Sequence, residues 1–317
     1  MHNKINYIFT FLVGVMVLIL YQIILGEKNK QNFIENENGL TINKNCYNYR
    51  MKCDQLFKKL RYPNKSLIIK PPPQMPPGDL MKRFTQDGAM PIIKQWYINE
   101  AYADSNSIEK KSQGKVTMDE FNEWLTKVKN NQKLVYYNVE LQITMKKYLD
   151  EIKGKSLVVV GTQQPWVEAI GYYLNASQIT TLDYTRKIYE LDRLVWLHVN
   201  DYLDDLISKK KELEQFDNSA SFSSIEHSGL GRYGDPLSPE GNIDAVQQVH
   251  CLLKPNGLFF LGLPTSNDDS SYIEFNAHRV YGSKRLGLLL DGWTQLEQVK
   301  CVNNVETIFV LRKNSLC

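Results

Sequence analysis

SLVVVG, residues 156–161, is a continuous apolar run that ends in a glycine. Such a valine-rich run is typical of a strand that is buried on both faces of a parallel sheet. PWVEAIGYYLNA at 165–176 follows with the spacing of a helix, and QITTLDY at 178–184 predicts the next strand. Strand and helix therefore alternate from this point. This pattern predicts an α/β fold with a doubly wound, mostly parallel, Rossmann-like sheet.

The alternation continues to the end of the chain, where two adjacent strands are expected to pair in an antiparallel manner. Between the second strand and a long helix lies a stretch, 193–202, that is helical or irregular in pattern. The elements expected after it are a helix at 202–215, a strand at 216–226, a helix at 241–253, a turn at 254–257, and strands at 258–264, 293–301 and 306–313.

The amino-terminal part of the chain predicts a membrane anchor at 1–27. Residues 5–25 carry no charge, and a helix rising about 1.5 Å per residue would cover a ~30 Å hydrocarbon core over this length. A cleaved signal peptide is the competing interpretation, but its apolar region would be shorter and followed by small residues. Lys4 before the span and Lys28 and Lys30 after it leave the orientation open.

Two further regions separate the anchor from the α/β domain, which we place at 154–317. Residues 28–79 are polar and end in a proline-dense segment, which predicts an extended stem. Residues 80–153 predict a helical flank, in which Thr117 and Glu120 have capping-box spacing. The helices expected in this flank lie at 89–104, 117–128 and 133–152.

Cysteines and glycosylation sequons bear on the compartment. Cys46 and Cys53 lie close together and would form a small disulfide loop in an oxidising lumen, although two unrelated free thiols remain the alternative. Cys251 falls in a helical pattern and is expected to be a core residue. The sequons at Asn64 and Asn175 permit lumenal glycosylation. We expect a single-pass protein of the endoplasmic reticulum or Golgi with a lumenal C-terminal domain.

Charge and motifs exclude some functions. The net charge is +3 and the basic residues are dispersed, whereas nucleic-acid binding requires a concentrated basic surface, so we expect no nucleic-acid partner. The chain contains neither a C-x-x-C pair nor an H-E-x-x-H motif, so no metal site is expected.

In a doubly wound fold, ligands bind beyond the carboxyl ends of the strands, where the strand order reverses. Gly161 follows the first strand, and Asp183 ends the second about twenty residues later, which is where an acid meets a ribose in nucleotide-binding folds. The alternative is that Asp183 caps a helix or forms a turn.

The loop SSIEHSGLGRYGDPLSPEGN at 223–242 concentrates polar side chains among glycines and prolines, which break both helix and strand. The ordinary pKa of His227 lies near neutrality, which suits a general base, and Glu226 would orient its ring. The alternative is that both residues only stabilise the turn. His278, in FNAHRVYG at 275–282, competes for the role of base. We expect a polar substrate to be bound by Arg232, Tyr233, Arg279 and Tyr281. The alternative for Arg232 is that it pairs with Asp235 and holds the glycine-rich loop.

Four stretches of the chain carry a family resemblance: VVVGTQQPWVEA at 158–169, SSIEHSGLGRYGDP at 223–236, LLKPNGLFFLGLP at 252–264 and FNAHRVYG at 275–282. They resemble an uncharacterised family of membrane-anchored proteins known as a domain of unknown function. The region from 156 to 313 is also similar to the class I S-adenosylmethionine-dependent methyltransferases. This resemblance implies S-adenosylmethionine as the cofactor, with Gly161, Asp183 and Asp217 as its binding residues.

The expected function is therefore methyl transfer from S-adenosylmethionine to a hydroxyl of a glycan or small molecule. The turn GTQQPW at 161–166 has bulky residues where the family has further glycines, which favours a non-catalytic binding or scaffold domain as the alternative. A lumenal glycosyltransferase is a further alternative, because it would share the plan of anchor, stem and domain and the acidic run DYLDD at 201–205.

Overall fold

The computed structural model describes residues 33–35, 41–61, 73–95, 114–135, 138–233 and 235–314. The membrane span predicted at 5–25 lies outside these residues. Within them, no helix has both the length and the apolar character needed to cross a membrane. The chain divides into two compact units, Met1–Lys52 with Leu316–Cys317, and Cys53–Ser315.

The predicted stem contains regular structure that its polar composition did not indicate. In the first unit, β1 (Phe33–Glu35) pairs with β2 (Thr41–Asn43) in an antiparallel manner. α2 (Lys44–Leu60) begins directly after β2 and continues into the second unit.

The second unit is built on a seven-stranded sheet, in which β14 alone runs opposite to the other six strands. Taken along the chain, the first five strands have the spatial order 3-2-1-4-5 of a doubly wound fold, and a hairpin adds the last two at one edge. The Rossmann-like, mostly parallel sheet predicted from the sequence is thus confirmed. Across the sheet the strands are β13 (Trp293–Lys300), β14 (Glu306–Lys313), β10 (Leu253–Pro264), β9 (Phe216–Phe222), β5 (Ser156–Val160), β6 (Gln178–Asp183) and β8 (Leu194–His198).

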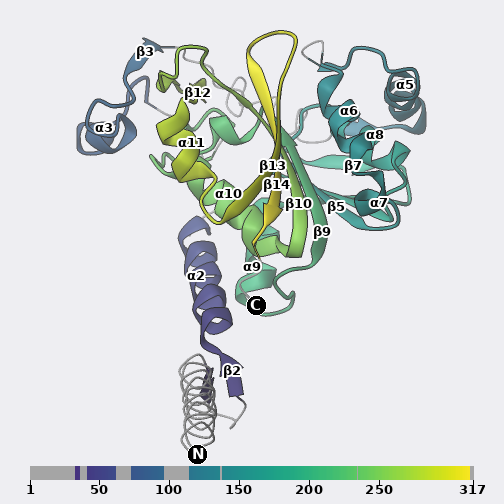
Figure 1. The fold of residues 1–317 in the computed structure, drawn as a ribbon, viewed down its shortest axis with the longest axis horizontal. Coiled ribbons are helices and arrows are strands. Elements are labelled where there is room, and N and C mark those ends of the chain that lie inside the picture. The colour runs from purple at the N-terminus through teal and green to yellow at the C-terminus, as the bar shows by residue number, and fades with distance from the viewer. Residues whose placement is uncertain are drawn as a thin grey trace, which may run out of the picture. The chain divides into compact units, whose positions relative to one another are not determined.

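Helices cover both faces of this sheet, as Figure 1 shows. One face packs against the helical flank and the first crossover helix, and their apolar side chains form the main core with β5, β6, β10 and β14. On this face lie α5 (Met118–Lys129), α6 (Glu140–Lys147), α7 (Leu149–Ile152) and α8 (Trp166–Tyr173). On the other face lie α10 (Gly241–Leu252) and α11 (Ser283–Leu289).

In the flank, one predicted helix start is confirmed and one predicted helix is divided in two. The predicted capping box is present at the start of α5: the amide of Glu120 donates to Thr117 Oγ1 at 3.2 Å, and the amide of Thr117 donates to Glu120 Oε2 at 2.9 Å. The single helix predicted at 133–152 is two helices, α6 and α7. They separate at Tyr148, whose backbone is not helical and whose ring packs against Phe260.

The crossover from β6 to β8 contains a strand instead of a helix. β7 (Lys187–Tyr189) pairs with β4 (Gly114–Val116) of the flank in parallel. The helix predicted at 202–215 is α9 (Val199–Ile207), which ends early because Lys209 adopts a left-handed backbone with φ +56°.

A small three-stranded sheet lies beside the main one and includes the start of the helix predicted at 89–104, whose residues 96–104 lie outside the described residues. Residues 92–95 form β3 (Ile92–Gln95), which pairs with β11 (Tyr272–Phe275), and β12 (His278–Val280) completes the sheet. Pairing with a strand far along the chain has overridden the helical spacing. Together with α3 (Gly78–Phe84), this sheet encloses a second apolar cluster of Phe84, Met90, Leu230, Ile273 and Phe275.

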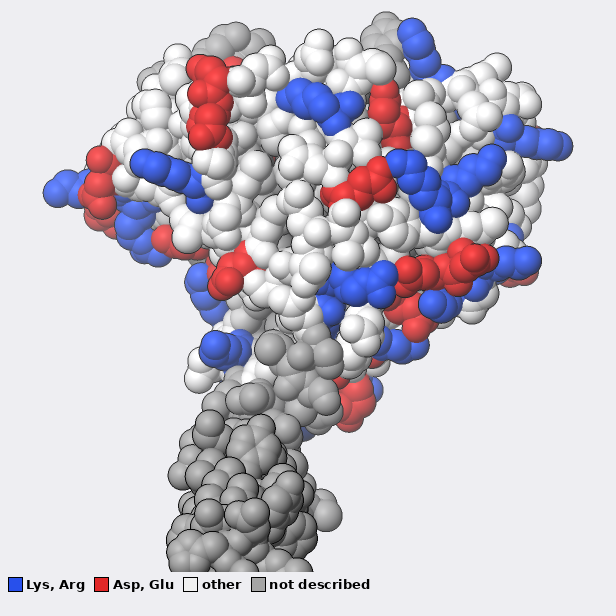
Figure 2. Space-filling model, in the orientation of Figure 1, with Lys and Arg blue, Asp and Glu red and all other residues white. Residues whose placement is uncertain are grey.

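On the face that Figure 2 shows, acidic and basic side chains are interspersed. Neighbouring charges of opposite sign cancel at a distance, so this face produces no strong field of a single sign.

A disulfide joins Cys53 of α2 to Cys251 of α10, and both residues are buried. The predicted pairing of Cys46 with Cys53 is therefore wrong. Cys251 is a buried core residue, as predicted, but the sequence did not indicate its bond to Cys53. Two ion pairs lie along the same contact: Lys59 Nζ lies 2.6 Å from Asp244 Oδ2, and Arg61 Nε lies 2.5 Å from Asp204 Oδ1. Residues 53–61 are therefore bound to the α/β domain and do not act as a free linker.

Removing the Cys53–Cys251 bond should destabilise the domain strongly, because it closes a loop with a sequence separation of 198 residues. For the double variant Cys53→Ser, Cys251→Ser we expect a loss of about 4–5 kcal/mol in unfolding free energy, from the chain entropy that the bond removes from the unfolded state. Denaturant titration with and without a thiol reductant measures this. Reductant should lower the unfolding midpoint of the parent and leave that of the variant unchanged. Equal unfolding midpoints for the two proteins without reductant would contradict the expectation.

Candidate functional site

The turn after β5 and the turn after β9 are in direct contact at the carboxyl edge of the sheet. Gly161 has a left-handed backbone, with φ +71°, and a Cβ added there would lie 1.8 Å from Ser224 Oγ. No other residue fits this position without displacing Ser224. This is the place where the strand order reverses, and where ligands bind in doubly wound folds.

Asp183 lies at the same edge, at the end of β6, and is partly exposed. Its Oδ2 accepts the amide of Thr162 and its Oδ1 accepts the amide of Thr185, both at 2.8 Å. Burial raises the pKa of this carboxyl, whereas the amide hydrogen bonds oppose that shift. Asp183 thus holds the turn after β5 through backbone amides.

The bulky residues of the GTQQPW turn are divided between the core and the surface. Trp166 is buried, and its ring packs edge-on against Phe222 with the centroids 5.2 Å apart. Pro165 precedes the first turn of α8, and the side chains of Gln163 and Gln164 are exposed. The bulk that replaces the family's glycines therefore lies in the core or in solvent.

His227 lies in a short 3-10 turn that follows β9, and its imidazole is almost wholly buried. Nδ1 lies 2.5 Å from the carbonyl oxygen of Ala277, which can only accept, so Nδ1 carries the proton and Nε2 keeps its lone pair. Nε2 lies 3.5 Å from Glu226 Oε1. Burial lowers the pKa of His227 to about 3, so the ring is neutral at neutral pH.

Glu226 is 1% exposed, and its Oε1 accepts a hydrogen bond from Ser223 Oγ at 2.8 Å. Its Oε2 is buried and has no hydrogen-bond partner among the residues that the structure describes. Burial raises the pKa of Glu226 to about 7, and the nearby Glu306 adds to the shift. Glu226 and His227 therefore form a buried pair in which burial favours the neutral form of both groups.

Three more of the predicted residues gather around this pair. The ring of Tyr233 lies 5.3 Å from that of His227, and the guanidinium of Arg232 lies 5.0 Å from the ring of Tyr233. The ring of His278 is 6.3 Å from that of His227, and its pKa is lowered by burial. Gln163 Nε2 donates to Tyr233 Oη at 3.3 Å, which joins the turn after β5 to this loop.

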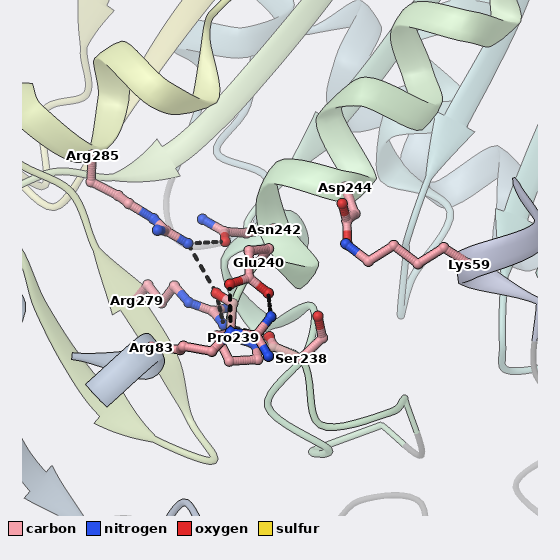
Figure 3. A network of polar contacts seen from close by, with 9 residues as sticks. All are labelled: Lys59, Arg83, Ser238, Pro239, Glu240, Asn242, Asp244, Arg279 and Arg285. Atoms are coloured by element: carbon pink, nitrogen blue, oxygen red, sulfur yellow. Dashed lines mark hydrogen bonds and ion pairs between the residues drawn. The ribbon is translucent and has the colours of Figure 1, made fainter. Parts of the chain in front are cut away.

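Arg279 and Tyr281, predicted to bind the acceptor, have their polar groups directed at the protein itself. Arg279 Nη1 donates to the carbonyls of Glu226 and Ser228. Its Nη2 donates to the carbonyls of Ser238 and Pro239, as Figure 3 shows. Burial lowers the pKa of Arg279 to about 10. Tyr281 Oη accepts from Asn242 at 2.9 Å. Both residues hold the loop in place.

Asp235 holds the loop, whereas Asp217 lies away from the predicted cofactor site. Asp235 accepts the amides of Gly229, Gly231 and Tyr233, so it holds the loop through the backbone. Asp217 lies at the amino end of β9, where it accepts from Ser156 and from Lys254. The structure therefore does not bring Asp217 to the edge that carries Gly161 and Asp183.

Comparison with known proteins gives a family but no activity. The family described as "Caenorhabditis protein of unknown function, DUF268" matches residues 154–313, just over half of the chain. The chain belongs to this family. No curated protein matches it.

Among solved structures, the DUF268 chain is similar to 1,6-didemethyltoxoflavin-N1-methyltransferase of Burkholderia thailandensis, with 13% identity, a TM-score of 0.43, and coverage of 62% of this chain and 87% of that one. It is also similar to the N-methyltransferase NodS of Bradyrhizobium japonicum, with 13% identity, a TM-score of 0.37, and coverage of 62% and 98%. Both of those structures contain S-adenosylhomocysteine. These likenesses are too distant to tell what this DUF268 chain does, and it is the strand order that shows its fold.

Beneath the turn after β5 lies a polar cluster that the sequence did not single out. Glu168 of α8 is fully buried, and its Oε1 accepts from Thr181 Oγ1 at 2.8 Å and from Tyr189 Oη at 3.1 Å. Burial raises its pKa to about 7. Lys187 Nζ donates to the carbonyl of Gln163 at 2.9 Å, which supports the turn from below. A glutamate among the apolar residues of WVEAIGYY was the available signal.

Among the described residues of this DUF268 chain, no cluster of side chains could hold a metal ion.

The pKa of Glu226 makes a testable prediction about stability. The pKa of Glu226 is about 7 in the folded protein, above the ordinary 4.5. The stability that Glu226 contributes is therefore fully present below pH 4.5 and is lost as the pH rises through about 7. Glu226→Gln cannot ionise, so relative to the parent it should gain up to about 3 kcal/mol of unfolding free energy between pH 5 and pH 8, at about 1.4 kcal/mol per pKa unit.

Denaturant titrations of both proteins at the two pH values measure this change. Glu123→Gln, on the exposed face of α5, is the matched control and should follow the parent at both pH values. Parallel behaviour of Glu226→Gln and the parent would mean that Glu226 is already ionised at pH 5.

Proposed function

We propose that the α/β domain binds S-adenosylmethionine and transfers its methyl group to a hydroxyl of a glycan or small polar molecule. One observation carries the proposal: the Gln163–Tyr233 hydrogen bond joins the turn expected to hold the cofactor to the loop expected to hold the acceptor. A transferase needs these two parts side by side, so that the reacting atoms can be held close together.

The residues at the cofactor end suit this ligand. Asp183 is partly exposed, and its carboxylate would accept a ribose hydroxyl as a charge-assisted hydrogen bond. The left-handed backbone at Gly161 keeps the turn narrow, and Trp166 is buried in the core and does not obstruct it. When bound, the cofactor supplies an electrophilic methyl group for an acceptor oxygen.

At the acceptor end, the chain's own residues would orient a hydroxyl and take its proton. The Nδ1 hydrogen bond to Ala277 fixes the imidazole of His227, with Nε2 as the free acceptor. Glu226 lies beside Nε2 and has a pKa near the operating pH, which favours proton transfer. Arg232 and Tyr233 would contact the polar body of the acceptor.

A non-catalytic binding domain is the second candidate, and one contact favours it. Ser224 Oγ fills the space beside Gly161 that a ligand would otherwise approach. The same fold would then bind a partner at this edge without turnover.

We further propose that the domain lies in the lumen of the secretory pathway, anchored by the apolar segment at 5–25. The Cys53–Cys251 disulfide supports this placement, because structural disulfides persist in oxidising compartments.

Calorimetric titration with S-adenosylmethionine tests the cofactor. Asp183→Asn removes the charge that strengthens the ribose hydrogen bonds, so we expect it to weaken binding by about 30-fold or more, equivalent to about 2 kcal/mol. Asp217→Asn, at the opposite edge of the sheet, is the matched control and should keep the parent affinity. No heat of binding to the parent would favour the non-catalytic domain, and equal losses in both variants would point to a general effect on folding.

Turnover tests the acceptor side. His227→Gln should keep the melting temperature near that of the parent and lose roughly 10²–10⁴-fold in turnover, which is the usual contribution of a general acid–base group. His278→Gln serves as the matched comparison, because the two rings are neighbours and compete for one role. The readout is release of S-adenosylhomocysteine on an acceptor that the parent methylates, and parental turnover in both variants would exclude histidine catalysis.

A further inference from the structure

The turn that joins α8 to β6 contains the sequence Asn175-Ala176-Ser177, an N-x-S sequon. The side chains of Asn175 and Ser177 are exposed, whereas Ala176 between them is buried. Asn175 has a left-handed backbone, with φ +59°, a conformation in which asparagine is enriched. The sequon is therefore displayed on a tight surface turn.

The contacts of this turn leave the reactive atom of Asn175 accessible. Asn175 Oδ1 accepts from Arg193 Nη1 at 3.1 Å, and the same Nη1 donates to the carbonyl of Ala176. Two hydrogen bonds hold the backbone of the turn. The amide of Gly154 donates to the carbonyl of Asn175, and the amide of Ser177 donates to the carbonyl of Lys155. These bonds involve Asn175 Oδ1 and backbone atoms of the turn, and none of them involves Asn175 Nδ2.

The position of the turn is also compatible with a bulky group. Asn175 precedes β6, at the amino edge of the sheet, whereas Gly161, Asp183 and His227 follow the carboxyl ends of their strands. A glycan at the amino edge would leave the candidate site open. The Cys53–Cys251 disulfide adds an independent indication of an oxidising compartment, in which N-glycosylation also takes place.

We propose that Asn175 is an N-glycosylation site. In the reaction, a bond forms between Asn175 Nδ2 and the anomeric carbon of an oligosaccharide, and the bond from that carbon to its lipid pyrophosphate carrier breaks. The pyrophosphate leaves with the bonding electrons, and Nδ2 loses a proton. The inference rests on the proposed lumenal placement and is independent of methyl transfer.

The full chain made in the presence of endoplasmic reticulum membranes tests this assignment. Ser177→Ala destroys the sequon without altering Asn175, whose left-handed backbone would be strained by substitution. Ser66→Ala is the matched variant of the second sequon, Asn64-Lys65-Ser66, which lies outside the described residues. Treatment with an N-glycosidase, followed by mass spectrometry, shows whether Asn175 has become aspartate.

We expect Ser177→Ala to remove one glycosidase-sensitive mobility step, and the parent to contain aspartate at 175 after treatment. If Ser66→Ala removes every such step while Ser177→Ala removes none, the domain is lumenal but Asn175 is not modified. If neither the parent nor the variants respond to the glycosidase, the proposal also fails. Because S-adenosylmethionine binding is measured separately, neither result decides the proposed function.

Discussion

The buried guanidinium of Arg279 is the constraint on which the candidate site depends. Its donors go to four backbone carbonyls, those of Glu226, Ser228, Ser238 and Pro239, which draws both ends of the glycine-rich loop to one point. A buried charge is tolerated only when its hydrogen bonds are satisfied, and a planar guanidinium can satisfy several carbonyls at once. Figure 3 shows Arg285 and Arg83 approaching the same segment, where Arg285 donates to Pro239 and Arg83 to Glu240. The loop is thus held from three elements, and the position of His227 follows from it.

The two halves of the site differ in how firmly they are held. Asp235 and Arg279 fix the backbone of the loop through hydrogen bonds to amides and carbonyls, and Asp183 does the same for the turn after β5. By contrast, the exposed side chain of Gln163 reaches the loop through a long hydrogen bond to Tyr233. Side chains at the surface change rotamer far faster than packed backbone moves. A ligand would therefore enter by displacing these two side chains, while the backbone on either side stays in place.

Local signals in the sequence predicted the alternation of strand and helix, the Thr117–Glu120 capping box and the final hairpin, because each depends on neighbouring residues. Pairings between distant segments were not predictable: β3 pairs with β11, and Cys53 bonds to Cys251 across 198 residues. At the site, Asp183 and Asp217 both lie on strands. Asp183 is at the carboxyl end of β6 and Asp217 is near the amino end of β9, so the two residues lie at opposite edges of the sheet. Arg279 and Tyr281 have the composition of a binding site, but whether such groups face a ligand or the backbone depends on burial, which spacing does not reveal.

Burial also changes which group can act as a base. It shifts the pKa of Glu226 up to about 7 and that of His227 down to about 3, so both favour their neutral forms. An imidazole with so low a pKa holds a proton poorly by itself, whereas an ionised carboxylate 3.5 Å from Nε2 would stabilise the imidazolium. A proton taken from an acceptor at Nε2 can therefore be kept only when Glu226 is ionised, or when the proton passes on to Glu226. In the proposed reaction, base catalysis would accordingly depend on the pair, and Glu226 would do more than orient the ring.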